Sequence, residues 1–148
     1  MGSLWVAAFR GRWGLVLEGG LESARVESLA PGRVWAAMQW LSLGPSVVFR
    51  PWAHWRIDVT LAVRGTRLEA GAEGYPSNDR TVLFAFGGVA SGGVSRQLVG
   101  PLWAQLRAFV SVRTPAEALT VANAGTVSLG PWEAGGLVGL SVDWEFPQ

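Results

Sequence analysis

The sequence has no cysteine and no lysine, and its 148 residues include one histidine. Without cysteine there is no disulfide framework, and thiol content gives no information on the compartment. One histidine without cysteine does not supply the ligands of a transition-metal site. The absence of lysine excludes a P-loop, and the glycines do not form a dinucleotide fingerprint. We therefore expect no metal and no cofactor.

Charge is also scarce. Charged residues make up 16% of the chain, against about 25% in ordinary domains. The net charge is +1 without any basic run, which argues against a nucleic-acid partner. Low charge favours a chain that buries extra surface against a partner, although a compact β-protein with glycine-rich turns would also fit. The lysine deficit fits a GC-rich genome, and few Cys, Asn and Met residues suit a thermophilic source.

Long hydrophobic runs are missing as well. No run reaches the roughly 18 apolar residues of a membrane helix, and we expect no membrane contact. Residues 1–10 lack a basic segment followed by a long apolar one, so no signal peptide is expected. The predicted location is a virion, or otherwise the cytoplasm.

Tryptophan is abundant, with nine residues. Each tryptophan buries roughly 150–250 Å² and dominates cores and interfaces. The count therefore indicates either a tryptophan-filled core or a tryptophan-rich contact surface.

The dominant sequence period is two. In residues 54–64 an apolar face (Trp55, Ile57, Val59, Leu61, Val63) alternates with a polar one, which predicts a half-buried strand with the apolar side in the core. Residues 102–113 repeat the pattern, with a mixed face that carries Trp103 and Arg107. Residues 138–146 form a third example and place Trp144 on an apolar face.

Twenty glycines and eight prolines punctuate the chain, as in sandwiches and barrels. We predict an all-β, antiparallel sandwich or small barrel of about 8–10 strands with at most one short helix. Residues 1–20 form an N-terminal arm or edge strands, and residues 21–148 form a single β domain. Gly65 is expected to be a turn, residues 87–93 a mobile segment, and residues 114–117 a helical turn with a capping box. Residues 34–43 also fit a helical period.

Candidates for chemistry are few, and no catalytic site is predicted. His54 lies on the polar side of its strand and is interpreted as a surface or interface residue. Asp143 and Glu145 share one strand face and could hydrolyse a glycoside only if two acids converged in a cleft. Asp58 and Glu69 could pair with Arg56 or Arg67 across the hairpin predicted at Gly65. Charges that alternate on a strand more often form its solvated face. No Ser-centred triad motif is present.

The aromatic residues are the remaining indication of function. Trp55 and Trp144 are interpreted as core. The interface or binding candidates are Trp103, Trp132, Arg107, Trp52 and His54, because Trp and Arg anchor contacts. We predict a non-enzymatic structural protein that self-associates within a larger protein assembly, best described as a phage virion component (capsid decoration or tail protein). The alternative is a carbohydrate-binding β-sandwich that uses exposed tryptophan, and a third reading is an uncharacterised hydrolase.

Overall fold

The protein is described by a computed structural model that covers residues 2–29, 32–74, 80–114, 117–121, 125–129 and 131–142. This part of the chain forms nine strands: β1 (Gly2–Arg10), β2 (Trp13–Leu29), β3 (Gly32–Trp52), β4 (Trp55–Glu73), β5 (Arg80–Val99), β6 (Leu102–Thr114), β7 (Glu117–Val121), β8 (Gly125–Leu129) and β9 (Trp132–Val142).

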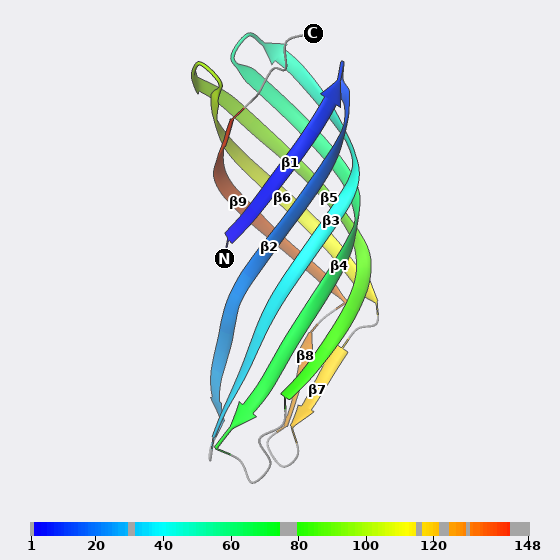
Figure 1. Ribbon diagram of the computed structural model, residues 1–148, viewed down its shortest axis with the longest axis vertical. Helices are drawn as coiled ribbons and strands as arrows, with labels where there is room; N and C mark the ends of the chain where they lie inside the picture. The colour runs from blue at the N-terminus through cyan, green and yellow to red at the C-terminus, as the bar shows by residue number, and fades with distance from the viewer. Residues whose placement is uncertain are drawn as a thin grey trace.

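Seven of these strands form one antiparallel sheet in the order β1-β2-β3-β4-β5-β6-β9, and β7 and β8 form a separate hairpin. The large sheet curls, so that β1 and β2 lie in front of β6 and β9 in Figure 1, while the upper part of β5 runs behind beside β6. The predicted all-β, antiparallel class is confirmed, with no helix in the described residues. The sheet is not closed into a barrel.

The strands are much longer than the usual five or six residues. β3, β4 and β5 have 21, 19 and 20 residues. The predicted turn at Gly65 is wrong, because Gly65 pairs with Leu41 on one side and Phe86 on the other. Residues 87–93 belong to β5, and residues 34–43 lie in β3. Neighbouring strands on both sides supply backbone partners, which outweighs the weak strand propensity of glycine.

The middle of the helical turn predicted at residues 114–117 lies outside the described residues; Thr114 ends β6 and Glu117 begins β7. At the other end of the chain, Gly2–Arg10 pairs with β2 as the edge strand β1. The predictions for Asp143, Trp144 and Glu145 fall outside the described residues.

The predicted period is correct, but the predicted inner face is wrong. On β4 every second residue from Trp55 to Val63 is apolar, points outward and is exposed. The alternate residues Arg56, Asp58, Thr60 and Arg64 are buried. On β6 the same inversion buries Trp103 and Arg107 and exposes Leu106 and Val110. Alternation shows that a strand has two unlike faces. It does not show which face is inside, and the assumption that the apolar one is inside holds for a sheet bathed by water.

The inversion stops near Gly65. Beyond it, Leu68 and Ala70 are buried on the concave side, and Arg67 and Glu69 lie on the outer side. The sheet thus has an upper part with polar side chains inside and a lower part with apolar side chains inside, in the orientation of Figure 1. An ordinary water-facing pattern is confined to the lower part.

Candidate functional site

The outer face of the upper sheet forms a continuous apolar surface, here called the outer band. The cross-strand register places its residues side by side on seven strands. They are Leu4, Val6 and Ala8; Leu15, Leu17, Gly19 and Leu21; Leu41, Leu43, Pro45 and Val47; Ile57, Val59, Leu61, Val63 and Gly65; Gly88, Ala90, Gly92 and Val94; Ala104, Leu106, Ala108, Val110 and Val112; and Ala134, Gly136, Val138, Leu140 and Val142.

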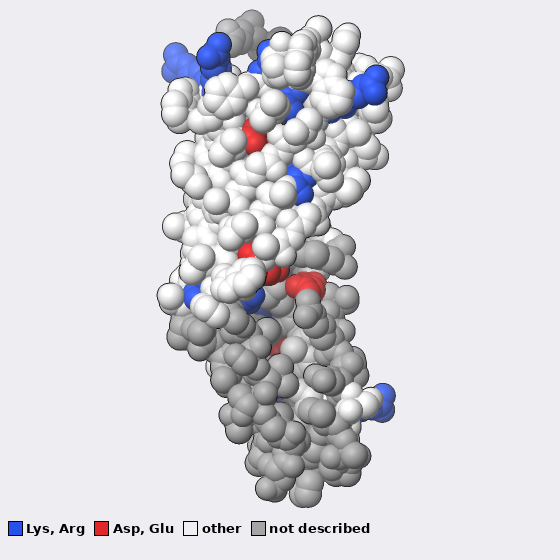
Figure 2. Space-filling model, turned by 180° about the vertical axis from the view of Figure 1, so that it is seen from behind, with Lys and Arg blue, Asp and Glu red and all other residues white. Residues whose placement is uncertain are grey.

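No polar side chain interrupts the outer band, which is unusual for a sheet in water. Its large residues are strongly exposed, with Leu61 at 61%, Val63 at 71% and Val138 at 86%. Contiguous apolar patches on monomeric soluble proteins rarely exceed a few hundred Å². Figure 2 shows uncharged atoms over most of the upper half from behind, with Arg atoms gathered at the upper rim. The outer band is therefore the candidate contact surface of the described part of the chain.

Exposed aromatic residues lie at both ends of the outer band. Trp13, Phe49, Trp52 and Trp55 lie at the end where β1–β2 and β3–β4 turn, near the outward residues Arg10 and Arg96. Phe84, Phe86 and Trp132 lie toward the opposite end of their strands. Aromatic residues therefore border the band where it meets charged surface.

The concave side of the upper sheet carries buried charged and polar side chains among apolar ones such as Val16 and Val48, and Arg107 on β6 is at its centre. The Arg107 guanidinium lies 3.1 Å from Asp58 Oδ2 and 3.8 Å from Glu18 Oε2, on β4 and β2. It also donates to Ser91 Oγ at 3.1 Å and Thr60 Oγ1 at 3.3 Å. One side chain thus connects strands from opposite walls of the curled sheet.

Three further arginines fill the concave side by a mixture of stacking and pairing. Arg64 lies over the Trp40 ring at 4.2 Å and the Phe109 ring at 5.3 Å. Arg56 lies 4.8 Å from the Trp103 ring centre, and Arg113 pairs with Glu133 at 3.2 Å. Planar guanidinium groups are suited to both kinds of contact.

Glycines make room for these side chains. A Cβ at Gly93 would lie 2.7 Å from Asp58 Oδ1 and 2.9 Å from Arg107 Cγ. A Cβ at Gly20 would lie 2.6 Å from the Trp40 ring. Two interior cavities have volumes of about 10 Å³ each, room for about one water molecule. The described interior is therefore filled rather than hollow.

The structure does not bring the predicted site residues together. Trp103 and Arg107 are buried on the concave side, whereas Trp132, Trp52 and His54 are exposed. His54 Nδ1 lies 3.2 Å from Gln97 Oε1 in the turn region after β3. Trp55, predicted to be core, lies in contact range of Arg96 on the outer side and is 37% exposed.

The predicted pairing of Glu69 with Arg67 is present, although both residues lie on β4 and not across a hairpin. Asp58 is buried against Arg107, while Glu69 pairs with Arg67 and Arg80 on the outer side. Among the described residues, no group of three or more His, Asp or Glu side chains could hold a metal ion.

The sequence reasoning missed the interior charges and the outer band. The signal for both was present in residues 54–64 and 102–113, where one face is wholly apolar and the other carries Arg with Asp or Ser. Inside a curled sheet, Arg, Asp and aromatic side chains from different strands can supply one another's hydrogen bonds, ion pairs and stacking contacts.

The part of the chain that the structure describes contains no helix of the length and hydrophobicity needed to cross a membrane. No family model, curated protein or solved structure matches the chain. The arguments for function therefore come from the geometry.

Proposed function

We propose that the outer band lies in the hydrocarbon of a lipid bilayer and that the protein is a non-enzymatic, membrane-spanning β-sheet. The observation that carries the proposal is the unbroken apolar outer face of seven strands, combined with a concave face that holds the buried charged side chains. Apolar-out, polar-in alternation is the arrangement of antiparallel sheets in membranes. A bilayer-embedded sheet departs from the expectation, drawn from the sequence, that the protein makes no membrane contact.

The dimensions of the outer band support this proposal. From Trp55 to Gly65, β4 is roughly 33 Å long at about 3.3 Å per residue. For a strand inclined by roughly 40° this corresponds to a height of about 25 Å, the usual height of a membrane-embedded apolar band. Aromatic residues at both ends of the band match the girdles found where such surfaces meet the lipid headgroups.

The energetics also favour lipid over water. Moving one Leu, Val or Ile side chain out of water stabilises by about 1.5–3 kcal/mol. The exposed large side chains of the outer band together represent on the order of tens of kcal/mol. The ion pairs and Arg stacks on the concave side keep the buried charges compensated at the same time, which the low dielectric of such a site requires.

The earlier hypotheses remain predictions. In a virion component the outer band would lie against other protein subunits, and interfaces of that kind normally carry polar atoms at their rim and within the patch. In the carbohydrate-binding alternative, Trp132 or Trp52 would have to provide the stacking surface. Neither hypothesis accounts for an apolar band bordered by aromatic residues at both ends.

A charge in the middle of the outer band tests the proposal. We expect Leu61→Arg to lower the free energy of unfolding in phospholipid vesicles by about 2–4 kcal/mol, because the guanidinium enters the bilayer midplane. Urea unfolding followed by tryptophan emission measures this change. The wild-type emission should also be quenched by lipids with brominated acyl chains, since Trp13 and Trp55 are exposed on the outer side.

Thr114→Arg is the matched control, because Thr114 is an exposed position at the end of β6, beyond Val112 of the outer band. Its cost should be about 0–1 kcal/mol, as for charges near the interface. A Leu61→Arg chain that folds in lipid-free buffer as stably as wild type, together with absent bromine quenching, would overturn the proposal.

A further inference from the structure

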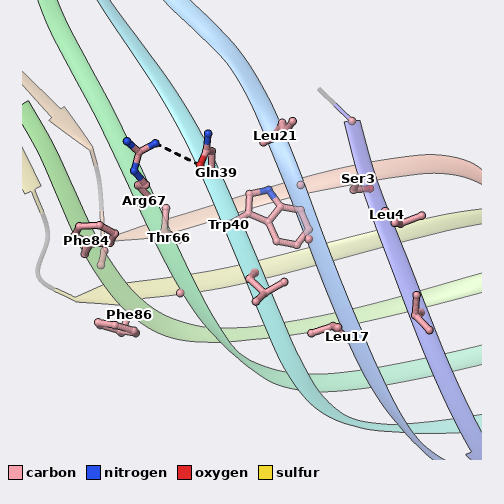
Figure 3. Close-up of a pocket in the computed structure, with 17 residues that line it drawn as sticks. Ser3, Leu4, Leu17, Leu21, Gln39, Trp40, Thr66, Arg67, Phe84 and Phe86 are labelled. Atoms are coloured by element: carbon pink, nitrogen blue, oxygen red, sulfur yellow. Dashed lines mark hydrogen bonds between the residues drawn. The ribbon is translucent and has the colours of Figure 1, made fainter.

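We infer that a groove in the outer face of β1 to β5 binds one phospholipid with an anionic headgroup, with its acyl chains in the groove and its phosphate at Arg67. This inference rests on the proposed function. The groove has a volume of about 940 Å³, within the range of small-molecule sites. Figure 3 shows Phe84 and Phe86 on one side of it and Leu4 and Leu21 on the other.

Two adjacent rows of outward residues explain the groove. The first row runs Leu4, Gly19, Leu41, Gly65 and Phe86 across the paired strands. Gly19 and Gly65 lack side chains between larger neighbours, which leaves a depression. At Gly65 a Cβ would meet only the Phe86 ring, at 3.7 Å, so the depression is open there.

The second row runs Gly2, Leu21, Gln39, Arg67 and Phe84 and contains the first outward polar side chains below the outer band. The groove therefore crosses the boundary between apolar and polar surface. A molecule bound here must be apolar along the first row and polar at Arg67. A lipid has both parts, whereas a wholly apolar or wholly polar ligand does not.

Charge at this boundary favours an anion. Arg67 Nη2 lies 3.0 Å from Glu69 Oε2, and Arg67 donates to Gln39 Oε1 at 3.4 Å. Arg80 also pairs with Glu69, so two guanidinium groups share one carboxylate. Further down, Arg33 and Glu73 are opposite each other in the register and balance. Among the described outward side chains Arg33, Arg67, Glu69, Glu73 and Arg80 the excess is one positive charge, carried by groups whose forked geometry matches a phosphate.

The test compares retained lipids in the purified protein by native mass spectrometry. Phosphatidylglycerol and phosphatidylcholine with identical acyl chains are added in equal amounts. We expect phosphatidylglycerol to be retained preferentially and Arg67→Gln to reduce its retention roughly fivefold, since one Arg near a membrane surface contributes about that factor. Gly65→Leu, which fills the depression, should reduce retention of both lipids.

The controls are Arg96→Gln, at the opposite end of the sheet beside Trp55, and Gly88→Leu. Gly88 faces outward with nothing within 4 Å of an added Cβ, so it adds the same side chain to the same face outside the groove. Both should retain lipid as wild type does. Equal retention of the two lipids by wild type, or unchanged retention in Arg67→Gln and Gly65→Leu, overturns the groove inference. Bilayer insertion in the Leu61→Arg experiment would still stand in that case, whereas failure to insert would remove both proposals.

Discussion

At the scale of single residues, arginine is the organising side chain of this protein. Arg107 contacts carboxylates on two other strands, and Arg64 lies over the rings of Trp40 and Phe109. Lysine offers a point charge without a planar face, so it could not replace these contacts. The concave side therefore requires arginine and not lysine at these positions, which is a second reason for the absence of lysine.

The small residue at position 93 is needed for the central ion pair. We expect Gly93→Ala to lower the free energy of unfolding by about 1–3 kcal/mol, the usual cost of overpacking. The added methyl group would overlap Asp58 Oδ1 and Arg107 Cγ, at 2.7 and 2.9 Å. Urea unfolding in vesicles or micelles measures the change.

Gly92→Ala is the matched control, because the nearest atom to its added Cβ is Asp58 O at 3.7 Å. It points outward on the same strand and should change the stability by less than about 0.5 kcal/mol. Equal losses for both variants would show that Gly93 does not act through Asp58 and Arg107.

At the scale of elements, each long strand carries two different amphipathic patterns in succession. In β4 the outer side is apolar up to Val63 and polar from Arg67. A strand of this kind passes through two environments along its length. A single alternation of apolar and polar side chains along the whole strand would suit only one of these two environments.

A cysteine scan along β4 should reveal this change directly, and the cysteine-free sequence needs no background substitutions. We expect labels at residues 57, 59, 61 and 63 to report an apolar environment. Labels at residues 67 and 69 should report water, because these outward positions lie below the outer band. The measurement is the emission of a polarity-sensitive thiol probe in vesicles, and emission typical of water at residues 59 and 61 would contradict the prediction.

Much of the fold could be predicted from the sequence, because strict alternation in residues 54–64 and 102–113 requires strands. The course of β4 through Gly65 and of β5 through residues 87–93 could not, since pairing on both sides overrides the local preference of glycine. Long-range pairs of this kind have no local signature.

The candidate site was less predictable than the fold. Trp103 and Arg107 were predicted to be interface candidates, whereas the structure buries both on the concave side. Their partners Arg56, Asp58 and Glu18 come from other strands. Which face of the sheet points inward depends on whether water or an apolar medium surrounds the sheet. Alternation records no such information, and the outer band was consequently read as core.

At the scale of the whole molecule, the two end strands need partners. β1 and β9 each pair with one strand only in the described sheet. In hydrocarbon an unpaired backbone N–H or C=O group costs several kcal/mol. Unpaired edges would explain the predicted self-association, since a second copy can supply the missing hydrogen bonds along β1 and β9.

Disulfide crosslinking tests edge pairing between copies. We expect a protein with Val6→Cys on β1 and Val138→Cys on β9 to form crosslinked oligomers in vesicles, because both residues lie on the end strands. The readout is mobility on a non-reducing gel. Leu61→Cys, in the middle of the sheet, is the control and should stay monomeric. A double variant that runs only as monomer would contradict pairing between copies.

The filled interior has an electrical consequence. Salt bridges and stacked rings occupy the space between the walls, and the two cavities there hold about 10 Å³ each. Hydrated ions cannot follow such a path. If the proposed bilayer placement holds, we expect a membrane that contains this sheet to keep its electrical resistance, because the described interior offers ions no path.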